Sequence, residues 1–158
     1  MTYELDASLH VPATPEEVYA LLSDITRTGE WSVQTEKAEW NSEARGVGAT
    51  FTGHNRTPER TWQTVSTVVI DEPGREFAWS VGPAEVIWGY RMQPQDGGTE
   101  LIQYTRFGER AEKVFAERHG EDAARQIEIR RKAARAGMPA TLERIAAILR
   151  SESPATER

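Results

Sequence analysis

The side chains that most often perform acid–base or metal chemistry are few and scattered in this sequence. Its three histidines, His10, His54 and His119, fall on different predicted elements, without HxxxH spacing or a nearby carboxylate pattern. Cysteine is absent, which excludes thiolate metal sites, disulfides and cysteine nucleophiles. We find no GxSxG turn, GxxxxGK phosphate loop or strand–turn–helix GxGxxG pattern. No metal or cofactor is therefore predicted, and any chemistry must come from positioning, desolvation and a few polar groups.

Two polar residues on predicted strands are candidates for such chemistry. Tyr90 shares strand parity with Trp88, so we expect it to point inward, where a buried phenol can donate a proton to a carbonyl. Asn55 shares the parity of Phe51 and can hydrogen-bond a ligand oxygen. His54 has the opposite parity and is expected at the surface. A bulge in that strand would turn it inward and make it the best general base in the chain.

The third candidate, Arg131, lies on a predicted helix of about residues 121–150. Apolar residues recur there with helical spacing, and at about 1.5 Å per residue the helix would be roughly 45 Å long. Pro139 should kink it. Arg131 projects from the apolar face and allows two interpretations. Either its stem packs inside while its head reaches solvent or a carboxylate such as Glu128 or Glu121, or the cation points into a cavity and stabilises an enolate or carboxylate.

The rest of the chain reads as strands and short helices that must position these groups. Thr14, Pro15 and Glu17 form a capping signal for a helix, and a second short helix is expected over 24–30. The charged segment 109–119 is predicted to be a helix that ends at Gly120. Strands are predicted over 2–11, 33–40, 49–56, 60–71, 75–81, 85–93 and 99–107. Short connections favour an antiparallel meander, so the predicted fold is α+β, a curved sheet of about seven strands closed over the long helix.

Strand alternation and the helical stripe together outline a cavity between sheet and helix. The last strand is ambiguous, because Leu101, Gln103 and Thr105 form one face and Ile102, Tyr104 and Arg106 the other, with apolar members on both. Any single one of these aromatics is better interpreted as ordinary core; together, on neighbouring strands facing an alanine-rich helix stripe, they indicate unfilled volume. The predicted ligand-binding residues are Phe51, Trp62, Phe77, Trp79, Trp88, Met92, Tyr104, Ile127, Ala134 and Met138.

Composition limits the class of protein. The 158 residues suit one domain, assigned to 1–150, with a disordered tail over 151–158. A net charge of -6 argues against nucleic-acid and anionic-membrane partners. The sequence has neither a signal-peptide pattern at its start nor an apolar run of membrane-spanning length. We expect a soluble, cytoplasmic protein without integral membrane contact, and a homodimer stays open.

The order of these elements resembles the helix-grip fold of the START and polyketide cyclase–dehydrase superfamily, which includes the birch-pollen allergen. The resemblance rests on ATPEEVYALLSDITRTGEW, VGATFTGHNR, RTWQTVSTVVIDEPGREFAWSV and WGYRMQPQDGGTEL. Together these segments cover most of residues 3–105, and the long helix completes the pattern. The sequence is most similar to small stand-alone members of actinobacterial type.

The resemblance implies a cavity that binds a lipid-like, polyketide-like or other apolar molecule, and it does not imply one reaction. Cyclisation or dehydration of the ligand is one expectation, so whether the protein is an enzyme stays open. The alternative is a carrier or ligand-sensing module without turnover, favoured by the lack of an acid–base pair. A weaker alternative is a chaperone-like or coenzyme-Q-binding accessory protein, which would need an exposed apolar patch.

Overall fold

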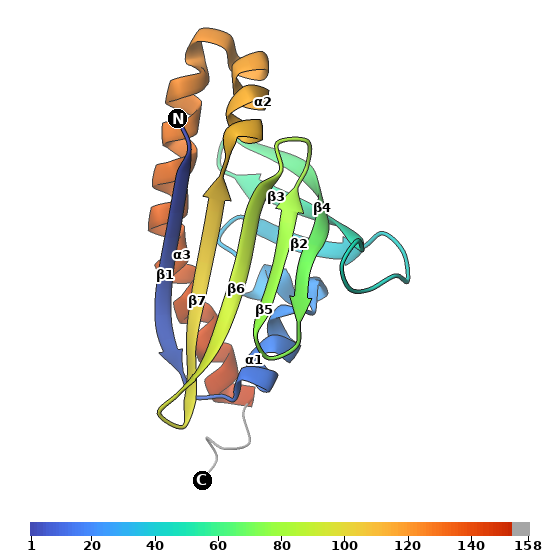
Figure 1. Cartoon of the computed structure of the whole chain (residues 1–158), viewed down its shortest axis with the longest axis vertical. Coiled ribbons are helices and arrows are strands. Elements are labelled where there is room, and N and C mark those ends of the chain that lie inside the picture. Colours follow the sequence, from blue (N-terminus) through green and yellow to red (C-terminus); the bar gives the residue numbers. More distant parts are fainter. Residues whose placement is uncertain (153–158) are drawn as a thin grey trace.

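A computed structural model describes residues 1–152, with strands and helices in the predicted order (Figure 1). Every predicted strand is present, with ends that move by no more than two residues. The elements are β1 (Tyr3–Val11), α1 (Pro15–Leu22), η1 (Ile25–Glu30), β2 (Thr35–Trp40), β3 (Thr50–Thr57), β4 (Arg60–Glu72), β5 (Glu76–Val81), β6 (Val86–Gln95), β7 (Gly98–Phe107), α2 (Glu109–His119), η2 (Gly120–Asp122) and α3 (Ala123–Glu152).

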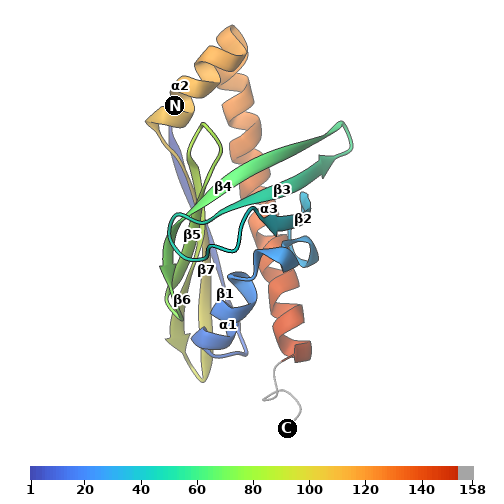
Figure 2. The same cartoon turned by 90° about the vertical axis from the view of Figure 1, so that its right-hand side faces the viewer.

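The strands form one antiparallel sheet in the order β1-β7-β6-β5-β4-β3-β2. Strands β2 to β7 therefore make a meander, and β1 pairs with β7 at the far edge. Helix α3 packs against β1 and β7, on the same face of the sheet as α1. Figure 2 shows the β3–β4 hairpin leaving the plane of the other strands, so that the sheet curves around α3. The architecture is the predicted helix-grip fold.

Local sequence signals account for where the helices begin and end. In α1, Thr14 and Glu17 cap each other's backbone N–H groups at 3.1 and 2.9 Å, and Pro15 stands at the first helical position. Gly120 ends α2 with a φ of +54°, a conformation that favours glycine. Helix α3 runs through Pro139 without a break, and the kink expected there stays a prediction.

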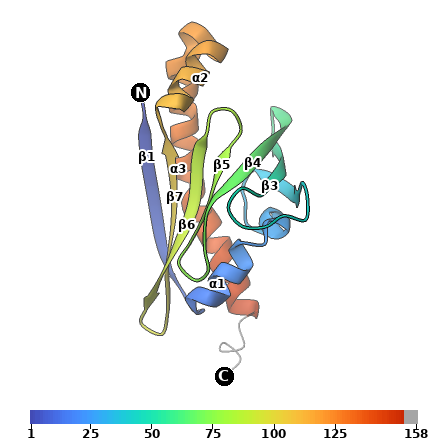
Figure 3. The same cartoon turned by 45° about the vertical axis from the view of Figure 1, so that its right-hand side comes forward.

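The apolar core is divided along the length of α3. A lower cluster joins α1, the C-terminal half of α3 from Leu142 onward, and the ends of β6 and β7 (Figure 3). An upper cluster joins Phe107, Phe115 and Ile127. A third cluster, around Phe51 and Phe77, lies over β2 to β5. The lower and upper clusters pin the two ends of α3 to the sheet.

Two expectations about the ends of the fold need a comment. Helix α3 continues to Glu152, so residues 151 and 152 are helical, although they were assigned to the tail. The rest of the predicted disordered tail, residues 153–158, lies outside the described residues. Within residues 1–152, no helix combines the length and apolar composition that crossing a membrane requires.

Candidate ligand-binding site

Cross-strand pairing decides which side chains face α3. Trp88, Tyr90 and Met92 pair with Thr105, Gln103 and Leu101 of β7, and these pair in turn with alternate residues of β1. Residues that pair directly project from the same face of a sheet. The inner face of β7 therefore carries Gln103 and Thr105.

Tyr104 consequently lies on the outer face, and its predicted place in the cavity is wrong. Its ring covers Gly89, and its hydroxyl donates to Glu76 Oε2 at 2.5 Å. The guanidinium of Arg91 stacks on the ring, with its central carbon 4.6 Å from the centroid. Burial and the Glu76 carboxylate raise the pKa of the Tyr104 phenol. Both faces of β7 carry apolar side chains, so strand alternation alone does not show which face meets the core. Tyr104 lies on the outer face, where its ring covers Gly89.

Between the lower and upper clusters, the inner face of the sheet carries residues that belong to no apolar cluster. Leu5, Trp62 and Trp88 point to the helix side of the sheet but stay half-buried, and they belong to none of the apolar clusters. On α3, Ala134 and Met138 are buried but likewise belong to none. We call this region the middle band; it comprises Leu5, Trp62, Thr64, Trp88, Gln103, Thr105, Arg131, Ala134 and Met138. Sheet and helix do not close into a continuous apolar core there.

Several other predicted ligand-binding residues are parts of the apolar clusters. Tyr90 and Met92 are 3% exposed in the lower cluster, Ile127 is in the upper cluster, and Phe51 and Phe77 are in the third. Aromatic rings connect these clusters: the Trp79 centroid lies 5.9 to 6.1 Å from the rings of Tyr90, Phe77 and Phe51. Trp79 is itself half-buried, so this chain of rings forms a wall beside the middle band.

Tyr90 is enclosed by the lower cluster. Its hydroxyl is hydrogen-bonded to the side chain of Trp31, which is 2% exposed. Burial raises the pKa of the phenol, and the Trp31 hydrogen bond opposes this effect. The hydroxyl is thus held neutral, and its oxygen accepts the hydrogen bond from the indole N–H of Trp31.

Asn55 is buried on the inner face of β3, as its parity predicts. Its Oδ1 accepts from Thr35 Oγ1 at 2.7 Å, and its Nδ2 donates to Thr64 Oγ1 at 3.1 Å. The amide therefore ties β2, β3 and β4 together at the level of its cross-strand neighbour Trp62. Its hydrogen-bonding groups are largely engaged within the protein.

Arg131 adopts the first of its two expected arrangements. Its Nε and Nη2 donate to the two Glu128 carboxylate oxygens at 2.7 and 2.6 Å. This bidentate pair raises the pKa of Arg131 and lowers that of Glu128. The guanidinium is directed along the helix surface, and its stem flanks the middle band.

Among the described residues, the neighbouring Arg130 makes fewer hydrogen bonds than Arg131. It is half-buried, stacks over Phe115 at 5.3 Å from the ring centroid, and donates to Gln126 at 3.2 Å. Burial lowers its pKa, and the positive charges of Arg60 and Arg118 lower it further. Within residues 1–152 no carboxylate forms an ion pair with it. A positive charge without an ion-pair partner in the described part of the chain therefore lies beside the upper cluster of this acidic protein.

His54 faces outward, and β3 pairs with β4 without a shift of register. The register shift in this part of the sheet lies in β2, between Thr35 and Lys37. His54 Nε2 lies 2.7 Å from Glu39 Oε1, and Nδ1 lies 3.3 Å from Gln63. The inward-facing alternative for His54 is not realised.

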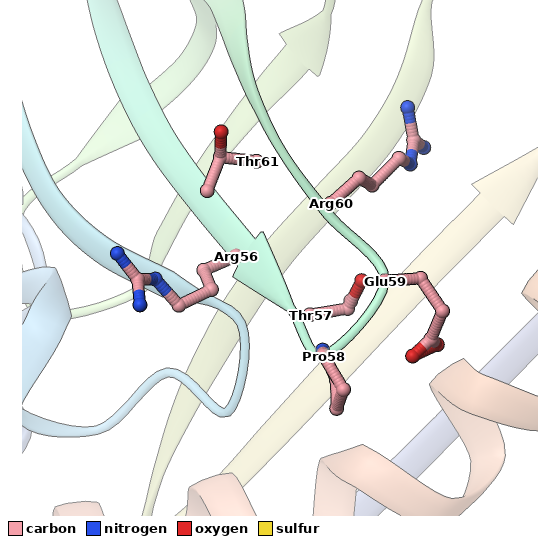
Figure 4. A pocket seen from close by; sticks show the side chains of 6 residues that line it. All are labelled: Arg56, Thr57, Pro58, Glu59, Arg60 and Thr61. Atoms are coloured by element: carbon pink, nitrogen blue, oxygen red, sulfur yellow. The ribbon is translucent and has the colours of Figure 1, made fainter.

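Hollows in the surface lie away from the predicted residues. An open hollow of about 630 Å³ is formed by the tip of the β3–β4 hairpin, between Arg56 and Thr61 (Figure 4). Another, of about 260 Å³, lies between α1 and the end of α3, where Glu17 and Leu149 contribute to its lining. No predicted site residue lines either hollow. Arg60, at the hairpin tip, stacks over Trp62 at 4.0 Å, which places a cation beside one aromatic residue of the middle band.

Comparison with known proteins identifies the fold. Residues 2–147 match the family described as polyketide cyclase / dehydrase and lipid transport. The chain is a member of the polyketide cyclase/dehydrase and lipid transport family. The solution structure of the Polyketide_cyc-like protein Cgl2372 from Corynebacterium glutamicum is 44% identical, with a TM-score of 0.71 over 98% of this chain and 96% of that one.

Two less similar solved structures share the fold alone. The Zhui aromatase/cyclase from a Streptomyces species is 19% identical, with a TM-score of 0.76 over 97% of this chain and 98% of that one. The di-domain aromatase/cyclase StfQ of the steffimycin biosynthetic pathway is 14% identical, with a TM-score of 0.72, and the match covers 93% of this chain and 50% of that one. No curated protein matches the chain.

Proposed function

We propose that this protein binds a small hydrophobic molecule in the middle band between the sheet and α3. The observation that carries the proposal is the interruption of the core: Leu5, Trp62 and Trp88 face the helix but stay partly exposed between two closed clusters. When an apolar molecule covers half-buried aromatic and aliphatic side chains, the free energy of binding becomes more favourable by about 25 cal/mol for each Å² of apolar surface removed from water. Membership of a family that includes lipid transport proteins supports the same function.

Within this proposal, binding without turnover fits the polar groups better than acid–base catalysis. Tyr90, Asn55 and Arg131 each already have hydrogen-bonding partners in the protein. A general acid or base must come within hydrogen-bonding distance of the proton that it transfers. Asn55 and Arg131 would have to exchange their internal partners for a ligand before they could act, and Tyr90, whose oxygen accepts from Trp31, is enclosed in the lower cluster.

Cyclisation or dehydration of a polyketide-like ligand is the second candidate function. The family description and the aromatase/cyclase neighbours favour it. In such a reaction the middle band would hold a linear chain folded so that its reacting carbons meet. This is a positioning effect, which needs little acid–base catalysis.

A substitution that fills the middle band tests the binding proposal. We expect Leu5→Trp to weaken binding of β-naphthol at least tenfold, because Leu5 faces α3 and is half-buried, so a larger ring there would occupy the space proposed for the ligand. Ser8→Trp is the matched control, since Ser8 is exposed on the outer face of the same strand, opposite Ile102. Isothermal titration calorimetry measures both affinities, and circular dichroism checks that both variants fold. Equal affinities in the two variants would refute the proposed location.

The two functions separate when the protein meets a linear poly-β-ketone thioester. A cyclase accelerates formation of a cyclised product that has lost water, which mass spectrometry detects against a protein-free control. A carrier retains the unchanged chain.

A further inference from the structure

Gln103 is the one inner-face amide of the middle band that the protein leaves without a partner. Its side chain is 6% exposed, and its Oε1 is buried without a hydrogen bond. Its Nε2 likewise makes no hydrogen bond to another of residues 1–152. A buried acceptor without a partner has lost its hydrogen bonds to water without replacement, which destabilises the folded protein.

The position of Gln103 places this amide at the boundary of the middle band and the lower cluster. It pairs with Tyr90 of β6 and with Ala7 of β1. Burial raises the pKa of the Tyr3 phenol, and the positive charges of Arg130 and Arg131 oppose this rise, which indicates that both arginines are near Tyr3. Strand β1 and helix α3 run in the same direction (Figure 1). From Tyr3 to Ala7 the strand rises about 13 Å, the rise of about nine helical residues. Counted from Arg130 and Arg131, that rise reaches residues 139–140, so Gln103 lies within about one helical turn of Met138.

The neighbours of Gln103 do not supply the missing donor. The Tyr90 hydroxyl oxygen accepts from Trp31, and its O–H makes no hydrogen bond to Gln103 within residues 1–152; Thr105 Oγ1 donates to the backbone oxygen of Ile87 at 2.9 Å. Ala7 and Met138 have no side-chain donor. By contrast, Asn55, the other buried amide of the inner face, has both of its ends bonded. Within residues 1–152 the Asn55 amide is therefore satisfied, and the Gln103 amide is not.

We infer that Gln103 accepts a hydrogen bond from a hydroxyl group on the bound molecule, so that the ligand class is a hydroxylated aromatic rather than a pure hydrocarbon. This inference rests on the proposed function, because it names the ligand's polar group within the same site. An apolar molecule covering Gln103 would leave the amide unpaired and gain less from binding. A phenol or enol hydroxyl supplies the missing donor while its ring covers Trp88 and Met138.

A pair of probes of equal shape tests the inference. The probes are β-naphthol and β-methylnaphthalene, which exchange a hydroxyl for a methyl group, and their affinities are measured by equilibrium dialysis. We compare wild type with Gln103→Met, which keeps the length of the side chain and removes the amide. We expect the preference for β-naphthol to fall about tenfold in Gln103→Met. Hydration of the probes is the same for both proteins and cancels in this ratio.

Two comparisons complete the experiment. Gln63→Met is the matched control, because Gln63 is exposed on the outer face of β4, and its preference should equal that of wild type. If Gln103→Met does not fold, wild type is tested with β-methoxynaphthalene, which keeps the oxygen and lacks the hydroxyl donor. We then expect binding about tenfold weaker than that of β-naphthol.

The outcomes separate this inference from the proposed function. An unchanged preference in Gln103→Met, with both probes bound, would overturn the role of Gln103 and leave the binding site standing. In the fallback comparison, equal binding of β-naphthol and its methyl ether would overturn it in the same way. Failure of wild type to bind either probe would overturn the proposed function and this inference together.

Discussion

The assignment of faces in β6 and β7 can be tested through Gly89. This glycine pairs with Tyr104 on one side and Ala78 on the other. A Cβ placed on it would lie 2.6 Å from Tyr104 Cζ and 2.8 Å from Ala78 Cβ. Non-bonded carbons prefer about 3.5–4.0 Å, so the tyrosine ring would have to move by roughly 1 Å. The close approach exists only if Tyr104 lies on the outer face, which is the same pairing that turns Gln103 inward.

We expect Gly89→Ala to lower the free energy of unfolding by about 2–3 kcal/mol. Displacing the ring weakens its hydrogen bond to the Glu76 carboxylate, worth about 1.5–3 kcal/mol, and its stacking with Arg91, worth about 0.5–1 kcal/mol. Loss of glycine's freedom in the unfolded chain offsets about 0.4–1 kcal/mol. For a chain of this size the midpoint of thermal unfolding should fall by about 4–12 °C.

Urea unfolding followed by circular dichroism measures the effect. Gly108→Ala is the control, since no atom lies within 4 Å of the added methyl, and it should change stability by less than about 1 kcal/mol. In a Tyr104→Ala background the effect of Gly89→Ala should shrink by more than about 1 kcal/mol. Strict additivity of the two substitutions would refute the pairing, and with it the inward position of Gln103.

Three further outcomes are expected. Tyr90→Phe should lower stability by about 1–2 kcal/mol in urea, because the buried Trp31 loses its hydrogen-bonding partner; an unchanged stability would contradict that contact. Asn55→Leu should lower it by about 1–3 kcal/mol, since two inner-face threonines lose their partner, and a neutral result would show that water replaces the amide. Hydrogen bonds from Arg125 and Gln126 lower the pKa of Asp122 to about 2, so its contribution is present above about pH 4 and disappears as the pH falls through 2. Thermal melts of Asp122→Asn should therefore depend less on pH in that window than those of wild type, and parallel profiles would contradict the assignment.

Much of the fold could be predicted because its signals are local. The Thr14–Glu17 capping box, the Gly120 break and the alternation along each strand depend on residues close in sequence. The ion pair of Arg131 with Glu128 is local too, being three residues apart on one helix, and it was one of two interpretations of Arg131. Family resemblance rested on the order of these elements and is confirmed over residues 2–147.

The site required the tertiary structure. Alternation assigns the residues of a strand to two faces, and when both faces carry apolar side chains it does not say which one meets the core. Tyr104 has the size of a core residue, yet it lies outside because Gly89 makes room for its ring there. Gln103 is not predicted as a site residue for the same reason. It shares a strand face with Leu101, but the sequence does not show whether that face meets the core.

The sequence by itself determined the elements, their order and the helix-grip architecture of this protein, because short-range backbone and periodicity preferences specify them. Only the tertiary structure decided that the core is interrupted between Ile127 and Leu142, and that Gln103 faces the interruption without a partner. The distance between a sheet and its helix depends on the packing of all side chains between them. That sum over distant residues is not encoded in any one stretch of the chain.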